Sequence, residues 1–348
     1  MPVTLNEMAK ITREPLGKAI LLDLLRQSRI LQMIPVDSVD ALKVTDTRWA
    51  TLPAVATRQI SQAYAESTGT VEQVEDTLFI YGGDIAVDRV LLKVNSVQNP
   101  LTLQGKMKVA ALAARFNYDF INNNHATLDL NGFEGLRTRV ANQPARMTIS
   151  LATAGDCLKV LASVANENLF IDAMHEALHK LGADAGDSLK DVNIACFMNE
   201  GTFLGFGKVL RRVGLLSVNT DNYGRIWNSF GPAKLVDIGL QSDQATEIIT
   251  STEDPGDGGA DSTSIYLVRF GGITKSDASG RTVVTDDDGL RLIQLAGTSP
   301  EPYDPLNGAE GGLGAAPAIV RRIDWVLGLK QAGRYSIVRL DGFKMAPS

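Results

Sequence analysis

The sequence of 348 residues lacks the features on which several classes of protein depend. Its longest purely apolar run, residues 109–114, is far shorter than the roughly 18 residues that a membrane-spanning helix needs. It has no basic excess either, because 34 Lys and Arg face 40 Asp and Glu, a net charge of −6 at pH 7. This balance argues against a protein that coats nucleic acid with a basic surface. Glu7 and Glu14 argue against a secretory signal peptide, whose first part is basic.

Cysteine and histidine are scarce as well. Cys157 and Cys196 stand in apolar surroundings without the Cys-x-x-Cys spacing, so we expect two reduced thiols in the core. Three histidines leave little material for catalysis or metal binding. The hydrophobic share of 44% is that of a folded chain, and the length predicts about two domains.

One short motif nevertheless matches the zinc peptidases. The run His-Glu-Ala-Leu-His would place His175 and His179 on one face of a helix, with Glu176 as general base on a zinc-bound water. Glu200 stands near the position of a third, carboxylate ligand.

Two observations count against a zinc site. Lys180 follows the motif directly and forms a favourable i,i+4 pair with Glu176, which is typical of a solvent-facing helix side. The other side of the same helix is expected to pack inward through Phe170, Met174, Ala177 and Leu181. We therefore predict neither a metal site nor catalytic residues, and zinc peptidase activity remains a remote alternative.

The first quarter of the chain predicts an arm and a hairpin. Residues 1–47 read as an arm with one amphipathic helix. Residues 48–83 predict a long hairpin with strands at 59–64 and 71–81 and a turn at 67–70. Its tip is polar on both faces and carries three acids: Glu66, Glu72 and Glu75. A ribbon without an apolar face is marginal by itself, so we expect it to lie across another subunit.

The rest of the chain mixes helices and strands. A strand at 85–94 precedes a helix of about residues 100–122, which Asn99 would cap. We expect one apolar stripe along this helix: Leu103, Met107, Ala110, Ala111, Ala114, Tyr118 and Ile121. A second helix is predicted at 156–181, a strand at 192–197 and a helix at 203–213. Closing strands at 318–329 and 334–343 are expected to pair with the strand before the long helix.

Five stretches in this order are similar to one known family. They are RWATLPAVATRQISQAYAESTGTVEQVEDTLFIYGGDIAVDRVL, NPLTLQGKMKVAALAARFNYDFIN running into FEGLRTRV, DVNIACFMNEGTFLGFGKVLRR, DNYGRIWNSFGPAKLVDIG and RRIDWVLGLKQAGRYSIVRLDG. The chain resembles the major capsid proteins of tailed bacteriophages that have the Hong Kong 97-type fold. The resemblance covers most of the sequence.

The resemblance implies an α+β fold with four parts. Residues 1–47 would be the N-terminal arm and 48–83 the extended loop, or E-loop. Residues 84–150 and 316–348 would form the peripheral domain, with the spine helix at about 100–122. Residues 151–315 would form an axial domain inserted into it.

The resemblance also implies a structural role without enzymatic activity or cofactor. Copies would assemble into hexamers and pentamers of an icosahedral shell that encloses double-stranded DNA without sequence-specific binding. The protein would be made and assembled in the host bacterial cytoplasm and would end in the virion capsid, without a membrane. It would work with a portal and with decoration proteins.

Two departures from the family refine these expectations. No lysine lies between Lys43 and Lys93, so the isopeptide bond that some relatives form from the extended loop is not expected. Other relatives carry a scaffolding segment before the arm, for which there is no room ahead of residue 48. We therefore expect a separate scaffolding protein, or assembly without one.

The family arrangement suggests where the acidic hairpin would bind. We expect its acids to pair with basic patches of a neighbouring subunit, either Arg137 and Arg139 or Arg321 and Arg322. An encapsulin-type nanocompartment, which shares the fold and encloses an enzyme, is the nearest alternative to a phage capsid.

Overall fold

The structure is a computed structural model of the chain. It describes residues 23–24, 26–88, 90–91, 99–152, 156–182, 193–215, 217–220, 226–254, 261–271, 273–276, 282–286, 289–296, 301–303, 318–331, 333 and 335–345. Most of the predicted arm helix lies outside the described residues. Its described end is α3 (Arg29–Met33). Leu31 of this helix and the preceding Leu24 are both buried in the core of the same chain.

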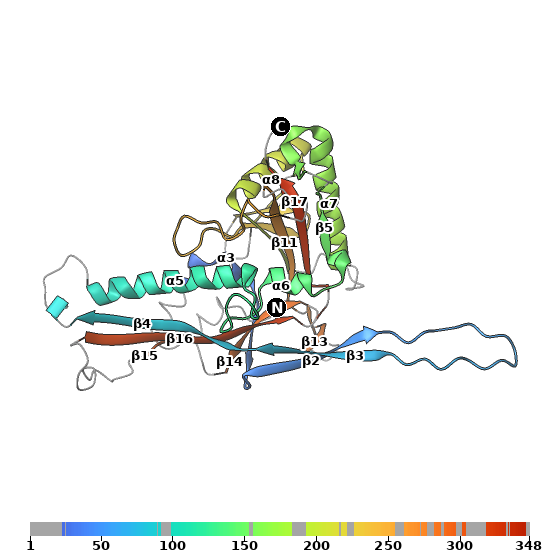
Figure 1. The fold of residues 1–348 in the computed structure, drawn as a ribbon, viewed down its shortest axis with the longest axis horizontal. Coiled ribbons are helices and arrows are strands. Elements are labelled where there is room, and N and C mark those ends of the chain that lie inside the picture. Colours follow the sequence, from blue (N-terminus) through green and yellow to red (C-terminus); the bar gives the residue numbers. More distant parts are fainter. Residues whose placement is uncertain are drawn as a thin grey trace.

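The lower lobe in Figure 1 packs one long helix along two long strands. Helix α5 (Pro100–Asn122) runs beside β4 (Phe79–Asp88), which pairs antiparallel with β16 (Ala318–Gln331). The helix begins as predicted, because the Asn99 side chain accepts a backbone hydrogen bond of 3.0 Å and proline follows it. The predicted return of a closing strand to the strand before the helix is confirmed for β16.

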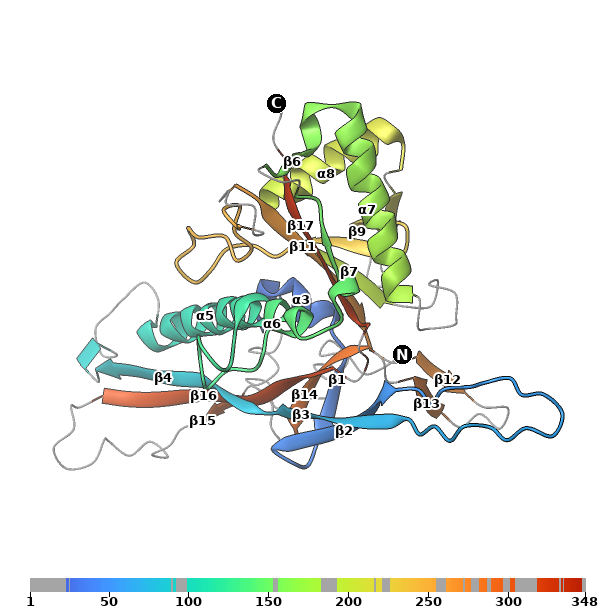
Figure 2. The same cartoon turned by 45° about the vertical axis from the view of Figure 1, so that its right-hand side comes forward.

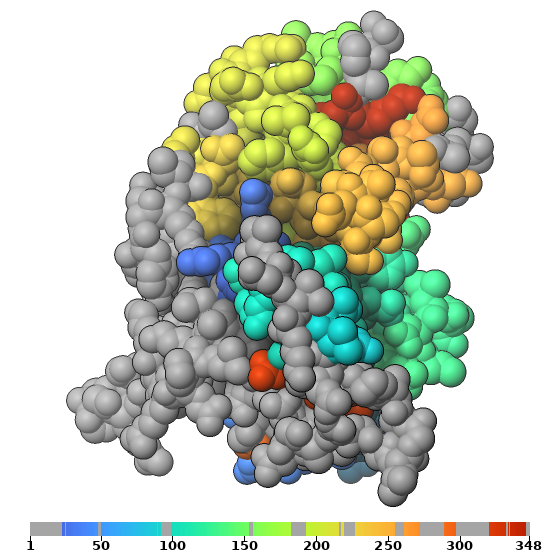
Figure 3. Space-filling model, turned by 90° about the vertical axis from the view of Figure 1, so that its left-hand side faces the viewer, coloured from blue at the N-terminus to red at the C-terminus, as the bar shows by residue number. Residues whose placement is uncertain are grey.

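The upper lobe packs two helices against a group of strands (Figures 1 and 2). The helices are α7 (Val164–Gly182) and α8 (Glu200–Val213). The strands at its centre are β7 (Asn193–Met198), β11 (Thr263–Phe270) and β17 (Ile337–Lys344). Figure 3 shows the molecule from the end at which α5 begins, with the upper lobe in yellow, green and orange above the cyan helix.

Shorter elements complete the described chain. They are β1 (Val36–Val39), β2 (Lys43–Thr51), β3 (Thr70–Thr77), α6 (Leu136–Ala141), η1 (Ala145–Met147), β5 (Thr148–Ser150), β6 (Leu158–Lys159), η2 (Val160–Ala162), β8 (Ser217–Thr220), β9 (Ile226–Phe230), β10 (Ala233–Asp237), β12 (Ile273–Ser276), β13 (Thr282–Asp286), β14 (Leu290–Leu295) and β15 (Glu301–Tyr303). A 13-stranded sheet runs through both lobes in the order β15-β16-β14-β11-β7-β10-β9-β8. Strands β1, β4, β5, β6 and β17 join it beside this path.

The two lobes have separate cores on opposite faces of this sheet. Along β7, Ala195 and Phe197 belong to the lower core, whereas Ile194, Cys196 and Met198 belong to the upper core. Side chains alternate between the faces of a strand, so a strand between two cores is apolar at every position. Side chains alternate along β11 in the same way. Tyr266, Val268 and Phe270 belong to the lower core, and Ile265 and Leu267 belong to the upper core.

The predicted stripe of the long helix is wrong, because Ile121 is the one residue of the seven that is buried. Leu103 and Met107 are exposed, while Val109, Leu112 and Phe116 are buried against β4 and β16. The helix is rich in alanine, and its apolar residues recur at helical spacing on more than one side. Periodicity alone therefore does not decide which side faces the core. Burial against the sheet selects the face that carries the phenylalanines.

The hairpin also differs from its prediction. Its ladder joins β2 to β3 and begins at Lys43, and 59–64 is not a strand. The tip turn lies at Gln59–Gln62 rather than at 67–70. The predicted turn residues form the base of the loop, where Thr70 pairs with Thr51.

Three boundaries differ as well. Helix α7 begins at Val164, because β6 and η2 occupy the preceding residues, and it ends at Gly182, one residue beyond the prediction. Strand β17 pairs with β11, β5 and β6 rather than with the strand before the long helix, and its Val338, Leu340 and Phe343 pack in the upper core while Ile337 reaches the lower one. Strand β4 begins at Phe79, six residues earlier than predicted, and ends at Asp88.

Candidate inter-subunit interface

The most exposed described segment is the extended loop, residues 52–69, which leaves the lower lobe opposite α5 (Figure 1). Every residue in it is exposed, and none belongs to a strand or helix. Several of its side chains are apolar nonetheless: Val55 is 97% exposed and Ile60 95%. Leu52 and Tyr64 are also among the exposed large side chains. Apolar side chains gathered on a projecting segment mark a surface that another molecule covers.

Local contacts give the tip of this loop a defined shape. The backbone N–H of Gln62 donates to the carbonyl of Gln59 at 3.2 Å, and Ser61 adopts a left-handed backbone with φ 70°. The Arg58 guanidinium lies 5.3 Å from the ring centre of Tyr64 and donates to the Gln62 carbonyl at 3.3 Å. Ile60 is thus held at the apex of a turn, with its side chain in solvent.

The base of the loop is closed by short polar contacts. The hydroxyls of Thr51 and Thr70 share a hydrogen bond of 2.6 Å, and the backbone N–H of Ala54 donates to the Ser67 hydroxyl at 2.7 Å. The two branches of the loop therefore stay together where they leave the ladder.

The three acids predicted as contacts lie in different surroundings. Glu66 is exposed on the loop, and Glu72 is half-buried on β3. Glu75 forms an ion pair with Lys43 across the ladder of its own chain. The structure therefore brings Glu75 to a partner within the chain, and contacts of Glu66 and Glu72 with a neighbour stay predictions.

The predicted basic partners are mostly engaged within the chain. Arg139 is only 8% exposed and pairs with Asp76 at 2.8 Å, so it is not a surface residue. Arg322 forms two hydrogen bonds with Asp84, at 2.6 and 2.9 Å. Arg137 lies 3.5 Å from the buried Glu253, and Arg321 stands opposite Ile85 in the register of β16 and β4.

Sequence reasoning missed the apolar character of the loop. The loop residues Leu52, Val55, Ile60 and Tyr64 are spaced at irregular intervals, so neither strand nor helix periodicity groups them on one face. Their exposure among the described residues is what identifies them as a surface.

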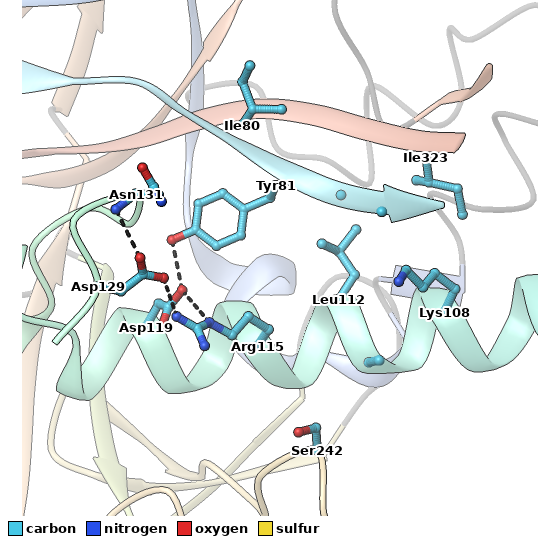
Figure 4. A pocket seen from close by; sticks show the side chains of 13 residues that line it. Ile80, Tyr81, Lys108, Leu112, Arg115, Asp119, Asp129, Asn131, Ser242 and Ile323 are labelled. Carbon is cyan, nitrogen blue, oxygen red and sulfur yellow. Dashed lines mark hydrogen bonds and ion pairs between the residues drawn. The ribbon is translucent and has the colours of Figure 1, made fainter. Parts of the chain in front are cut away.

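A groove of about 360 Å³ lies between β4 and α5 (Figure 4). Its apolar end is formed by Leu112 and Ile323, together with residues of small side chain, while the side chain of the neighbouring Ile80 points away from α5. Ile80 is 71% exposed at the rim. Gly82 and Gly83 of β4 also line the groove, and the side chain of Lys108 occupies the space beside Gly83.

The polar end of the groove is a connected cluster (Figure 4). Tyr81 donates its hydroxyl hydrogen to Asp119 Oδ2 at 2.9 Å, and Arg115 Nε donates to the same oxygen at 2.9 Å. Arg115 Nη2 also reaches Asp129 at 2.5 Å. Asp119 Oδ1 is buried without a hydrogen-bond partner among the described residues.

Burial shifts the ionisation of this cluster. It raises the pKa of the Asp119 carboxyl above its ordinary value, although the hydrogen bond and charge of Arg115 act in the opposite direction. It also raises the pKa of the Tyr81 hydroxyl, and the charge of Asp119 adds to this shift. Tyr81 therefore remains a neutral donor toward Asp119.

The His-Glu-Ala-Leu-His motif lies on the outer side of α7. His175, Glu176 and His179 are exposed, and Glu176 pairs with Lys180 at 2.8 Å, as predicted. The His175 ring lies 4.8 Å from that of Phe230. Glu200 begins α8 and is exposed. The four side chains expected to face inward are fully buried: Phe170, Met174, Ala177 and Leu181.

Neither metal clusters nor membrane helices occur in the described part of the chain. No three His, Cys, Asp or Glu side chains come together there in a way that would hold a metal ion. None of its helices is long and apolar enough to cross a membrane. Cys157 and Cys196 are buried free thiols, as predicted, and burial raises the pKa of both.

Comparisons by sequence find no relative: neither a protein-family model nor a curated protein matches. Solved structures do match. The chain is similar to the capsid of the native GTA particle, with 14% identity, a TM-score of 0.56, and coverage of 91% of this chain and 90% of that one. It is similar to the holo-SrpI encapsulin complex of Synechococcus elongatus PCC 7942, with 12% identity, a TM-score of 0.55, and coverage of 91% and 88%.

A structure of Microbacterium phage Oxtober96 is also similar, with 15% identity, a TM-score of 0.51, and coverage of 90% of each chain. At such identities the likeness concerns the fold. It confirms the resemblance that the sequence indicated: the chain has the α+β fold of Hong Kong 97-type capsid proteins.

Proposed function

We propose that this chain is the major capsid protein of a tailed bacteriophage. Copies assemble into hexamers and pentamers, and these form an icosahedral shell around double-stranded DNA. The role is structural and requires no reaction at any side chain. In the finished particle the protein is part of the virion capsid, after assembly in the host bacterial cytoplasm.

The observation that carries this proposal is the extended loop. Residues 52–69 are exposed throughout and include the apolar side chains of Leu52, Val55, Ile60 and Tyr64. A monomeric protein would gain nothing from this arrangement, since covering apolar surface is what stabilises a fold. In a closed symmetric assembly every copy provides the same cover to a neighbour.

The charge of the chain is compatible with a container for DNA. A net charge of −6 gives no general attraction for phosphates, so packaged duplex would not be held on the wall. A scaffolding protein, a portal and decoration proteins are the partners that this role implies.

An encapsulin-type shell that encloses a protein is the second candidate. The encapsulin complex of Synechococcus elongatus is as similar to this chain as the GTA capsid, with TM-scores of 0.55 and 0.56. The two candidates share the assembly and differ in what the shell encloses.

Electron microscopy of the purified protein tests the shared claim, and analysis of the contents separates the candidates. We expect capsomers or closed shells that form with rising concentration. Shells that package double-stranded DNA beside a portal and a DNA-packaging enzyme support the phage role, and a single co-purifying enzyme supports the encapsulin role. A monomer of about 37 kDa at all protein and salt concentrations contradicts both.

A further inference from the structure

A pair of histidines lies on the outer side of α7, the helix that flanks the strands of the upper lobe (Figure 2). His175 and His179 are four residues apart, and both are exposed. Side chains at this spacing are neighbours on a helix surface, with their Cβ atoms about 5–6 Å apart. An imidazole nitrogen binds a metal ion at a distance of about 2 Å. Both rings can therefore reach a single ion that lies between them.

The helix that carries this pair is firmly held. Its opposite side is fully buried in the upper core through Phe170, Met174 and Leu181. The His175 ring also packs on the ring of Phe230, with 4.8 Å between the ring centres. The backbone of the site and one of its two rings are thus constrained before any ion binds, which reduces the conformational entropy that binding costs.

The charges around the pair favour a cation. Lys180, which follows the second histidine, forms an ion pair with Glu176 at 2.8 Å, so its positive charge is balanced beside the site. Asp172 is exposed one turn before the pair and adds a negative charge on the same side of the helix. His179 lies in the last turn of α7, where the helix dipole attracts positive charge.

We propose that His175 and His179 together bind one divalent transition-metal ion of the group Zn²⁺, Ni²⁺ and Cu²⁺, for which neutral imidazole is a common ligand. The site differs from that of a zinc peptidase. In the described part of the chain no third His, Cys, Asp or Glu comes together with the pair, and Glu176 is engaged by Lys180. The remaining coordination positions are open to water, and a bound ion stabilises the folded upper lobe against unfolding.

Calorimetric titration with Ni²⁺ tests the site in the full chain without a histidine tag. We expect binding at about pH 7.5 that is roughly tenfold or more weaker at about pH 5.5, because the imidazoles must be unprotonated to bind. His175→Ala and His179→Ala should each weaken binding by about tenfold or more. His125→Ala is the control, since it removes the third histidine of the chain, whose ring contacts Phe79 in the lower lobe. The two thiols are buried and do not compete for the ion.

Moving the second histidine along the helix provides a matched pair of variants. Asp172→His combined with His179→Ala places a histidine one turn before His175 and should restore binding to within about tenfold of the parent. Asn168→His combined with His179→Ala places it seven residues before His175, about 10 Å along the helix axis, and should restore nothing. Asp172 and Asn168 are both exposed on the outer side of α7, so both variants should fold.

The outcomes are independent of the proposed shell function. If His175→Ala and His179→Ala bind Ni²⁺ as tightly as the parent, or if His125→Ala loses as much as they do, the pair is not the site and the inference is overturned. A parent chain that binds no Ni²⁺ overturns it as well. Equal binding by the two relocated variants would contradict chelation by neighbouring rings. Electron microscopy of the shells tests the function separately, so either claim can fail without the other.

Discussion

At the scale of single residues, Arg139 joins three separate parts of the lower lobe. Its guanidinium pairs with Asp76 at 2.8 Å and donates to the carbonyls of Leu329 and Glu134 at 2.8 and 2.9 Å. Asp76 in turn accepts from the backbone N–H of Gln331 at 3.0 Å. The pair thus ties the hairpin, the residues before α6 and the end of β16 to one another.

We expect Arg139→Met to lower the free energy of unfolding by about 3–5 kcal/mol, because it leaves the Asp76 carboxylate buried and unpaired. Urea unfolding followed by circular dichroism measures the loss. Arg322→Met is the control, since its pair with Asp84 is exposed to solvent and should matter far less. Equal losses for the two variants would contradict this account of Arg139.

Asp119 predicts a dependence of stability on pH. Burial raises the pKa of the Asp119 carboxyl in the folded state above its value in the unfolded chain, which is about 4. The contribution of this shift to the free energy of unfolding is therefore fully present below about pH 4. It is lost as the pH rises through the pKa of the folded state. Asp119→Asn lacks this contribution. The advantage of the parent over this variant in urea unfolding should therefore be larger at about pH 4 than at about pH 8.

Asp84 supplies a control of opposite sign. The hydrogen bond from Arg322 lowers the pKa of Asp84, so its contribution is present above the unfolded pKa and is lost as the pH falls through the folded pKa. The advantage of the parent over Asp84→Asn should grow from about pH 4 to about pH 8. Parallel trends for the two variants would show that neither shift governs stability.

Single charges show where prediction from sequence ends at this scale. Arg139 and Arg322 stand in basic pairs of the sequence, which suggested surface patches. Their partners, Asp76 and Asp84, lie 63 and 238 residues away in the chain. The Glu176–Lys180 pair was predictable because a helix fixes the distance between residues four apart.

At the scale of elements, the extended loop makes a prediction about proteolysis. Arg58 lies in an exposed segment without secondary structure, the kind of backbone that proteases cut. Trypsin should cleave the free chain at Arg58 and should leave this bond intact in assembled shells. Mass spectrometry of the fragments checks the site, and Arg58→Gln is the control that removes it. Equal cleavage at Arg58 in free and assembled protein would mean that the loop stays uncovered.

The long helix shows what the sequence settles about an element and what it leaves open. Its limits were predictable, because Asn99 and the following proline mark a helix start locally. Its inner face was not, since Leu103 and Met107 are as apolar as the buried Val109 and Leu112. The choice between such faces depends on β4 and β16, which approach from distant parts of the chain.

At the scale of the whole molecule, the shared sheet predicts cooperative unfolding. Strands β7 and β11 contribute alternate side chains to both cores, so unfolding of one lobe removes strands against which the other core packs. Phe116→Ala in the lower core and Phe170→Ala in the upper core should each cost about 3–5 kcal/mol. Each should shift one common transition in calorimetry. Two separate transitions would show that the lobes unfold independently.

The order of elements along the chain was enough to predict the fold class, and the details of pairing were not. The return of β16 to β4 follows from placing a long closing strand beside the strand before α5. Strand β17 follows β16 directly yet lies in the upper lobe, where it pairs with β11 in antiparallel register. Strands buried on both faces read as apolar throughout, so the sequence does not tell which core each side chain enters.

The exposed loop has a consequence for the life of a single copy before assembly. Apolar side chains in water, on backbone whose N–H and C=O groups have no ladder partners, are the features of an aggregation-prone segment. Pro53 near one end, which cannot donate to a ladder, and the tight turn at Ser61 limit its ability to add to a foreign sheet edge. Under the proposed shell function, the solubility of newly made protein would therefore depend on how quickly a neighbour covers residues 52–69.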